Sequence, residues 1–254
     1  LMPRYALLVE YDGAGFVGWQ RQETGLSVQQ VLEEAAAQLT PRDPVVAVAA
    51  GRTDAGVHAE AQVVHLDLAR EIEPRRLREA VNFHLGAHRV AVVQAARAPA
   101  EFHARFSAIG RAYRYDILDR RARPALLAGR VWHVKRRLDE AAMRAAAALL
   151  VGRHDFTSFR AAACQAASPV KTLDRLEVAR DGDLVRITAE ARSFLHHQVR
   201  NLVGTLKLVG EGRWTPADVS AALAARDRAA AGPTAPPEGL TLTAVRYAVD
   251  PFAA

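Results

Sequence analysis

The sequence is poor in cysteine, aromatic residues and lysine, and it contains no long apolar run. The single cysteine, Cys164, excludes a disulfide within the chain and a metal cage built from several thiolates. No apolar stretch approaches the roughly 18 residues of a membrane-spanning helix, so we expect a soluble, cytoplasmic protein with no membrane partner. Half of the 254 residues are hydrophobic, which is enough for one large or two medium-sized cores.

Positive charge is unevenly distributed along the chain. Residues 1–107 carry 11 basic and 13 acidic side chains, whereas residues 108–254 carry 23 basic and 15 acidic ones. Nine of the basic residues fall within residues 111–137, which hold only two acidic residues. Only three of the 34 basic residues are lysine, which indicates a compositional bias toward arginine, but bias does not explain the clustering. An uneven basic surface is typical of a polyanion binder, so we expect a nucleic-acid partner.

Hydrophobic periodicity predicts strands and helices in the same order in both halves of the chain. In the first half, strands are expected at residues 5–10, 45–50, 61–68 and 90–95, and helices at residues 27–39 and 74–85. In the second half, strands are expected at residues 112–118, 173–180, 184–192 and 241–249, and helices at residues 138–151, 195–209 and 216–226. The pattern predicts an α+β fold of two tandem βαββαβ units (ferredoxin-like, or RRM-like), residues 1–107 and 108–254, each with one sheet face open for a ligand.

The most informative motif is residues 51–59 (GRTDAGVHA), which follow the apolar run of residues 45–50. That run predicts a strand buried on both faces, so Asp54 is expected in a loop carried by a core strand, where chemistry is often placed. Its small neighbours leave room for a planar ligand. A cation such as Arg52 within about 4–6 Å would keep the carboxylate ionised and therefore nucleophilic. The alternative is an ordinary strand-to-loop turn with a surface aspartate.

Residues 13–18 (GAGFVG) match the dinucleotide-binding pattern G-x-G-x-x-G, but their context argues against it. In the Rossmann arrangement the last glycine opens a helix, whereas here residues 19–25 (WQRQETG) intervene before the next expected helix. We therefore expect no bound dinucleotide, and a dinucleotide-dependent oxidoreductase is a weak alternative. Phe16, Trp19 and Arg21 instead suit a loop that contacts RNA.

Residues 111–115 (RAYRY) combine basic and aromatic side chains on an expected strand. Alternation puts Arg111, Tyr113 and Tyr115 on one face and Arg114 on the other. A tyrosine flanked by cations on an open sheet can stack on an unpaired base; packing in a protein core is the alternative.

Residues 193–204 (SFLHHQVRNLVG) are expected to open a helix on which His196, Arg200 and Lys207 share one stripe beside an apolar arc. Arg200 would then sit at the edge of a buried face, where an arginine usually has a carboxylate partner. Adjacent histidines are more often surface or capping residues than metal ligands, so no metal is expected.

These segments together resemble the tRNA pseudouridine synthase A family, over nearly the whole chain. The similar segments, in the order that the family has them, are residues 11–13, 16, 18–20, 51–59, 102–107 (FHARFS), 111–115, 154–160 (HDFTSFR) and 194–204. Glu101 stands where an aspartate is more usual, and Gln198 where a methionine is expected. Neither residue touches the chemistry that the resemblance implies.

The resemblance implies isomerisation of uridine to pseudouridine at positions 38, 39 and 40 of the tRNA anticodon stem-loop. It also implies a homodimer without a cofactor, in which two such units flank a central basic active-site cleft. Asp54 would be the essential aspartate and Arg52 would enter the base stack to help flip the uridine. Tyr113 would pack on the base, and Arg200 would pair with the Asp54 carboxylate. Attack at C6, attack at C1′ and abstraction of a ribose proton all remain open as the role of Asp54.

Further RNA contacts are expected from basic residues and histidines across the chain. These residues are Arg21, His58, Arg111, Arg114, Arg120, Arg121, Arg123, His196 and Lys207. The alternative function is a non-catalytic RNA-binding protein on the same scaffold. It accounts for the charge but not for an aspartate in a basic cleft, where a carboxylate repels phosphate.

Overall fold

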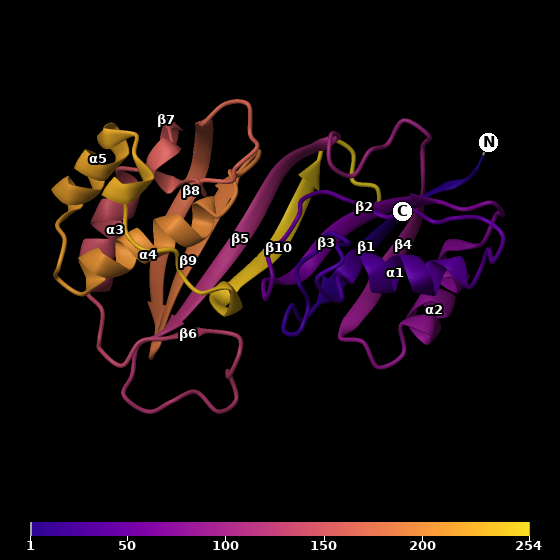
Figure 1. The fold of residues 1–254 in the computed structure, drawn as a ribbon, viewed down its shortest axis with the longest axis horizontal. Coiled ribbons are helices and arrows are strands. Elements are labelled where there is room, and N and C mark those ends of the chain that lie inside the picture. The colour runs from indigo at the N-terminus through magenta and orange to yellow at the C-terminus, as the bar shows by residue number, and fades with distance from the viewer. Residues whose placement is uncertain (1, 254) are drawn as a thin grey trace. The chain divides into compact units, whose positions relative to one another are not determined.

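The computed structural model describes residues 2–253 and shows a mixed α/β protein whose strands are mostly antiparallel (Figure 1). The chain forms two compact units: unit 1 consists of residues 2–110 and 242–253, and unit 2 of residues 111–241. The sequence put the boundary at residues 107/108 and the last strand in the second half. In the structure most of that strand lies in unit 1, because β10 (Leu240–Tyr247) pairs with β3 (His58–Asp67). Among the described residues, no helix has both the length and the apolar character needed to cross a membrane.

Unit 1 is a sheet packed against two helices. Its strands follow the order β4-β1-β3-β10, with β2 also paired to β3, and β1 is antiparallel to both β3 and β4. The remaining bounds are β1 Arg4–Tyr11, β2 Val48–Ala49, β4 Val90–Ala98, α1 Val28–Ala37 and α2 Pro74–Leu85. Ser27 caps α1, since its hydroxyl accepts a hydrogen bond from the Gln30 amide at 3.1 Å.

The strand expected at residues 45–50 is much shorter in the structure. Only Val48–Ala49 forms β2, which meets β3 at His65 and Val64. Val46 is 61% exposed, so the prediction of a strand buried on both faces is wrong. The ladder with β3 includes only these two residues, so most of the run lies outside regular strand structure.

The strands of unit 2 follow the order β5-β9-β8-β7, each antiparallel to its neighbour, and β6 is parallel to β5. Its strands are β5 Ala108–Leu118, which begins in unit 1, β6 Trp132–His133, β7 Gly152–Asp155, β8 Val170–Asp181 and β9 Leu184–Ala191. Its helices are α3 Glu140–Ala148, α4 Gln198–Gly210 and α5 Pro216–Ala225, with 3₁₀ turns η1 Thr157–Phe159, η2 Arg228–Ala230 and η3 Pro237–Gly239.

Candidate active site

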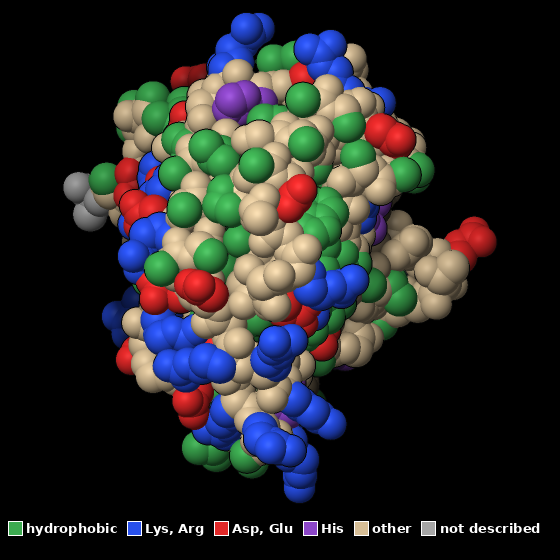
Figure 2. All heavy atoms as spheres, turned by 90° about the vertical axis from the view of Figure 1, so that its left-hand side faces the viewer, with side chains coloured by type: hydrophobic (Ala, Val, Ile, Leu, Met, Phe, Trp, Pro, Cys, Tyr) green, Lys and Arg blue, Asp and Glu red, His purple; other side chains and the backbone are tan. Residues whose placement is uncertain are grey.

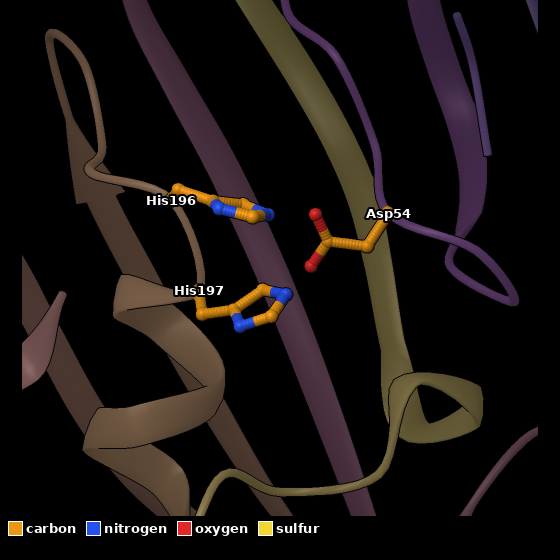
Figure 3. Close-up of side chains that lie close together, drawn as sticks. All are labelled: Asp54, His196 and His197. Carbon is orange, nitrogen blue, oxygen red and sulfur yellow. The ribbon is translucent and has the colours of Figure 1, made fainter. Parts of the chain in front are cut away.

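The Asp54 side chain belongs to the aspartate loop, residues 51–57, which leads from β2 into β3 (Figure 3). The backbone of this loop is held at both ends. The amide of Ala50 donates to the carbonyl of Val63 at 2.8 Å, and the amide of Val57 donates to the carbonyl of Asp54 at 3.1 Å. Arg52 is exposed and Asp54 is half-buried. The loop therefore offers a carboxylate and a guanidinium from a fixed backbone.

The residue before Asp54 is anchored in the core of unit 1. Thr53 is buried, and its hydroxyl is hydrogen-bonded to the Tyr11 hydroxyl at 2.7 Å. The amide group of Gln62 donates to the carbonyl of Gly51 at 2.8 Å. Burial raises the pKa of Tyr11 to about 12, against the opposing effect of its hydrogen bonds with Thr53 and Gln62. The Tyr11 hydroxyl is therefore protonated at neutral pH and remains a stable partner for Thr53.

The loop after β1, residues 12–20, lies directly against the aspartate loop. The amide of Trp19 donates to the carbonyl of Thr53 at 3.0 Å. A Cβ on Gly18 would lie 2.8 Å from that same carbonyl oxygen, and Gly18 has a φ of +107°, which side chains rarely adopt. The glycine thus serves a close approach between two protein backbones, which explains its presence without a dinucleotide phosphate.

His58 was expected to contact RNA, but its side chain is buried, at 4% exposure. The Nδ1 atom accepts a hydrogen bond from the Gly13 amide at 3.0 Å and lies 3.1 Å from Asp12 Oδ1. Arg89 donates to the other carboxylate oxygen of Asp12 at 2.9 Å. A Cβ on Gly13 would lie 2.1 Å from the Val57 carbonyl oxygen, so the two loops are in contact here as well. His58 therefore supports the aspartate loop from within the fold and does not offer a surface to RNA.

In unit 2, Tyr113 extends from β5. Its half-buried ring meets the ring of Phe194 edge to face at 5.3 Å. Tyr115, on the same face of β5, is fully buried and donates its hydroxyl hydrogen to the carbonyl of Pro236 at 2.7 Å. Tyr115 is therefore a core residue, which is the alternative that the sequence left open for this strand.

The arginines of β5 are held by neighbouring groups. Arg111 donates to the carbonyl of Arg192 at 2.6 Å. Arg114, on the opposite face, pairs with Asp116 at 2.9 Å, and Arg186 binds the other oxygen of the same carboxylate at 2.8 Å. The opposite face of this sheet therefore carries a charge network.

His196 and His197 precede α4 and are not part of it (Figure 3). His197 has a φ of 61°, in the left-handed region, so the helix begins at Gln198. The Gln198 side chain also accepts a hydrogen bond from the amide of Leu195 at 2.8 Å, which closes the preceding turn. The single stripe expected for His196, Arg200 and Lys207 is therefore wrong, because only the last two residues are helical.

Arg200 and Lys207 are both held within unit 2. Arg200 is half-buried, and its Nε donates to the carbonyl of Ala235 at 2.8 Å. The ammonium of Lys207 lies 2.6 Å from the carboxylate of Glu211 and 5.3 Å from the centre of the Trp132 ring. Lys207, which was expected to contact RNA, is thus occupied by an ion pair along its own helix and by an aromatic ring.

The segment between β5 and α3, residues 119–137, exposes many cations, and we call it the basic arm. Four of them are exposed and make no ion pair with any described residue: Arg121, Arg123, Lys135 and Arg136. Arg120 and Arg137 approach Asp183 at 3.6 and 3.4 Å. Leu126, within the arm, is 98% exposed. Figure 2 shows Lys and Arg side chains gathered toward its lower end, where Figure 1 draws the segment between β5 and β6.

Two supporting residues had no individual role in the sequence interpretation. Gln62 fixes the carbonyl of Gly51, and Phe194 packs against Tyr113. A polar residue within an expected strand was the only available signal for Gln62. For Phe194 there was no signal beyond its position in residues 194–204, because its partner Tyr113 lies on a distant strand.

The family described as tRNA pseudouridine synthase matches residues 7–107 and 146–248 of the chain. A protein of Acidiphilium cryptum named tRNA pseudouridine synthase A is 68% identical over 252 residues, which cover 99% of each chain. Proteins of the same name from Rhodospirillum centenum and Gluconobacter oxydans are 63% and 54% identical, over 97% and 98% of this chain and 100% and 91% of their own. The aspartate loop lies within the first matched stretch and α4 within the second, whereas β5 lies between the two stretches. The resemblance found in the sequence is confirmed, and the chain belongs to the tRNA pseudouridine synthase family.

Proposed function

We propose that this protein isomerises uridine to pseudouridine in tRNA, with Asp54 as the essential catalytic residue. The observation that carries the proposal is the Asp54 carboxylate on a loop whose flanking residue Thr53 is fixed in the core by Tyr11. Membership of the family supports the reaction type. We extend the proposal to positions 38, 39 and 40 of the anticodon stem-loop as the target uridines.

The reaction breaks the bond between N1 of the base and C1′ of the ribose, and forms a bond between C5 and C1′. C5 loses a proton and N1 gains one, so no cofactor has to supply electrons. The base must leave the helical stack before it can turn, which costs a few kcal/mol. Arg52 is exposed on the same loop as Asp54 and would fill the space that the base vacates. Tyr113 would pack on the extruded base.

The chemistry of Asp54 requires an ionised carboxylate whether it attacks C6, attacks C1′ or abstracts a ribose proton. In the proposal, Arg200 pairs with this carboxylate.

We further propose that two ferredoxin-like subdomains flank a basic cleft and that the protein acts as a cytoplasmic homodimer. The element order β1-α1-β2-β3-α2-β4 in unit 1 supports the first part. The remaining candidates for RNA contact are Arg21, Arg111, Arg114, Arg120, Arg121, Arg123 and His196, each exposed or half-buried.

The Asp54→Asn variant tests the proposal with a tRNA transcript tritiated at C5 of uridine. We expect tRNA binding within about twofold of the parent protein and no tritium release, because the amide is neither charged nor nucleophilic. Asp43→Asn is the matched control, since it removes the same charge from an exposed site in unit 1. Turnover by Asp54→Asn would refute the catalytic assignment. Tight binding by the parent protein without tritium release would favour the non-catalytic alternative.

The target positions require a second measurement. Anticodon-arm transcripts that carry a single uridine at position 38, 39 or 40 are incubated with the parent protein, and the modified site is mapped. We expect modification at each of the three positions, and modification elsewhere alone would contradict the anticodon assignment.

A further inference from the structure

The direction of the Arg200 side chain is set by a segment that comes later in the chain. The Nε of Arg200 donates to the carbonyl of Ala235 at 2.8 Å, and the amide of Ala235 donates back to the carbonyl of Arg200 at 3.0 Å. Ala235 is fully buried. It belongs to residues 227–239, which we call the strap. A shift of the strap along α4 would therefore move the group that orients the Arg200 guanidinium.

The strap lies directly on the backbone of α4. A Cβ on Gly204 would lie 1.7 Å from the Pro233 carbonyl oxygen, so no larger residue fits there without displacing the strap. The amide of Gly232 donates to the hydroxyl of Thr205 at 2.9 Å. These contacts fix the distance between the backbone of the strap and that of α4.

The Arg228 guanidinium fixes the strap by a fork of hydrogen bonds. One nitrogen donates to the carbonyl of Gly232 at 2.9 Å. The other donates to Asn201 Oδ1 and to Thr234 Oγ1, both at 3.1 Å. The hydroxyl of Thr234 in turn donates to Asn201 Oδ1 at 2.6 Å. One guanidinium thus joins three points of the strap and helix, which is the planar geometry that arginine offers and lysine does not.

Two features indicate that geometry, and not charge pairing, is the role of this arginine. Arg228 makes no ion pair with any described residue, so its hydrogen bonds all go to neutral oxygens. Asn201 is fully buried, and its amide group also donates to the carbonyl of Phe159 at 2.9 Å, which fixes its orientation. Asn201 is the residue after Arg200 on α4.

We propose that Arg228 is a positioning residue that fixes the Arg200 guanidinium through Asn201, Thr234 and the carbonyl of Ala235. The proposal rests on the proposed function, in which Arg200 acts on the Asp54 carboxylate. When the fork is lost, the strap and α4 can shift against each other and the Ala235 carbonyl no longer holds Arg200 in one direction. Small misplacements of a group at a reacting centre have large effects on rate.

The test compares Arg228→Lys, Arg228→Gln and Thr234→Val in steady-state and single-turnover assays on a tRNA transcript. We expect kcat to fall at least about tenfold in both Arg228 variants, with KM and tRNA affinity within about twofold of the parent. Thr234→Val removes only the hydrogen bonds of the Thr234 hydroxyl, so its kcat should fall less than that of the Arg228 variants. Arg226→Gln is the matched control, because Arg226 is close in the chain and its only ion pair with a described residue is the one with Asp155, at 3.6 Å. We expect it to behave as the parent protein.

A double-mutant cycle separates positioning from a purely structural role. If Arg228 acts through Arg200, then Arg228→Gln combined with Arg200→Lys should lose little more rate than Arg200→Lys alone. Additive losses, or an unchanged kcat in the Arg228 variants, would overturn the proposal. Full activity of Arg200→Lys and of Arg200→Ala would overturn it as well. Failure of the proposed function is distinct, because the parent protein itself would then release no tritium.

Discussion

Tyr11 holds the aspartate loop by one hydroxyl, and its removal should affect the rate more than binding. Tyr11→Phe leaves the buried Thr53 hydroxyl without this partner, which costs about 1–2 kcal/mol of unfolding free energy. Because Thr53 precedes Asp54, we also expect kcat to fall severalfold with KM nearly unchanged. Urea unfolding and tritium-release kinetics measure the two effects.

The control for Tyr11 lies on the same strand. Tyr5 is fully buried, and its hydroxyl is hydrogen-bonded to the backbone of Ile72 at 2.8 Å. Tyr5→Phe should therefore lose a similar amount of stability and keep its kcat. Equal kcat values for the two variants would show that the Tyr11 hydroxyl has no bearing on the catalytic loop.

His65 makes the stability of unit 1 depend on pH. It is 5% exposed, and its Nδ1 accepts a hydrogen bond from the Ala104 amide at 3.1 Å. Burial, followed by the charges of Arg4 and His103, lowers its pKa to about 4. As the pH falls, the His65 ring is protonated near pH 6.5 in the unfolded chain, but only near pH 4 in the folded chain. The contribution of His65 to the unfolding free energy is therefore fully present above pH 6.5. It is lost as the pH falls from 6.5 to 4, by about 3 kcal/mol at the lower end of this range.

The His65→Asn variant tests this dependence. Asparagine keeps an acceptor near the position of Nδ1 and does not titrate. We expect the unfolding free energy of the variant, measured in urea between pH 7.5 and pH 4.5, to lack the part of the slope that His65 contributes. Identical slopes in the variant and the parent would assign the acid sensitivity to other groups.

At the scale of elements, the basic arm provides a test that leaves the chemistry untouched. Arg121 and Arg123 are exposed and make no ion pair with described residues. If both contact phosphates, the double variant Arg121→Gln/Arg123→Gln should weaken tRNA binding and flatten the plot of log affinity against log salt by roughly 0.7–0.9 per lost contact. Arg75→Gln, on the exposed face of α2, is the control. An unchanged salt slope would place the RNA elsewhere.

Elements with local signals were predictable from the sequence. The capping box of Thr215 and Asp218 starts α5, and Pro74 is the first residue of α2. The hairpin of β8 and β9 turns at Gly182, which has a φ of +58°. By contrast, β6 and β7 were not expected, since strands of two and four residues exist only through pairing with distant segments. The left-handed His197, which delays the start of α4, also has no local signal.

The location of the aspartate loop was predictable, but the surroundings of its neighbours were not. The motif placed Asp54 in a loop at the end of a strand, and the structure has it there. Residue type alone could not tell that His58 would be buried against Gly13 or that Lys207 would pair with Glu211. Those outcomes depend on which segments pack together. The sequence pattern around a histidine or lysine is the same whether the side chain lies on the surface or contacts another part of the protein.

At the scale of the whole molecule, charge and candidate chemistry are divided between the two units. Unit 1 carries 12 basic and 14 acidic residues, and unit 2 carries 22 basic and 14 acidic residues. The aspartate loop belongs to unit 1, whereas the basic arm belongs to unit 2. Substitutions on the surface of unit 2 can therefore tune affinity for a polyanion while the loop that carries Asp54 keeps its own supports.

The return of residues 242–253 to unit 1 has a consequence for how the protein is made. Most of β10 and Tyr247, whose hydroxyl donates to the carbonyl of Ala104 at 2.7 Å, leave the ribosome long after β3 has emerged. The nascent chain thus carries an open strand edge, a hazard for aggregation, while the continuous segment that forms unit 2 is still being translated. A message cut short before codon 242 would encode the aspartate loop together with Tyr11, Trp19 and Gln62, and yet leave their sheet unfinished.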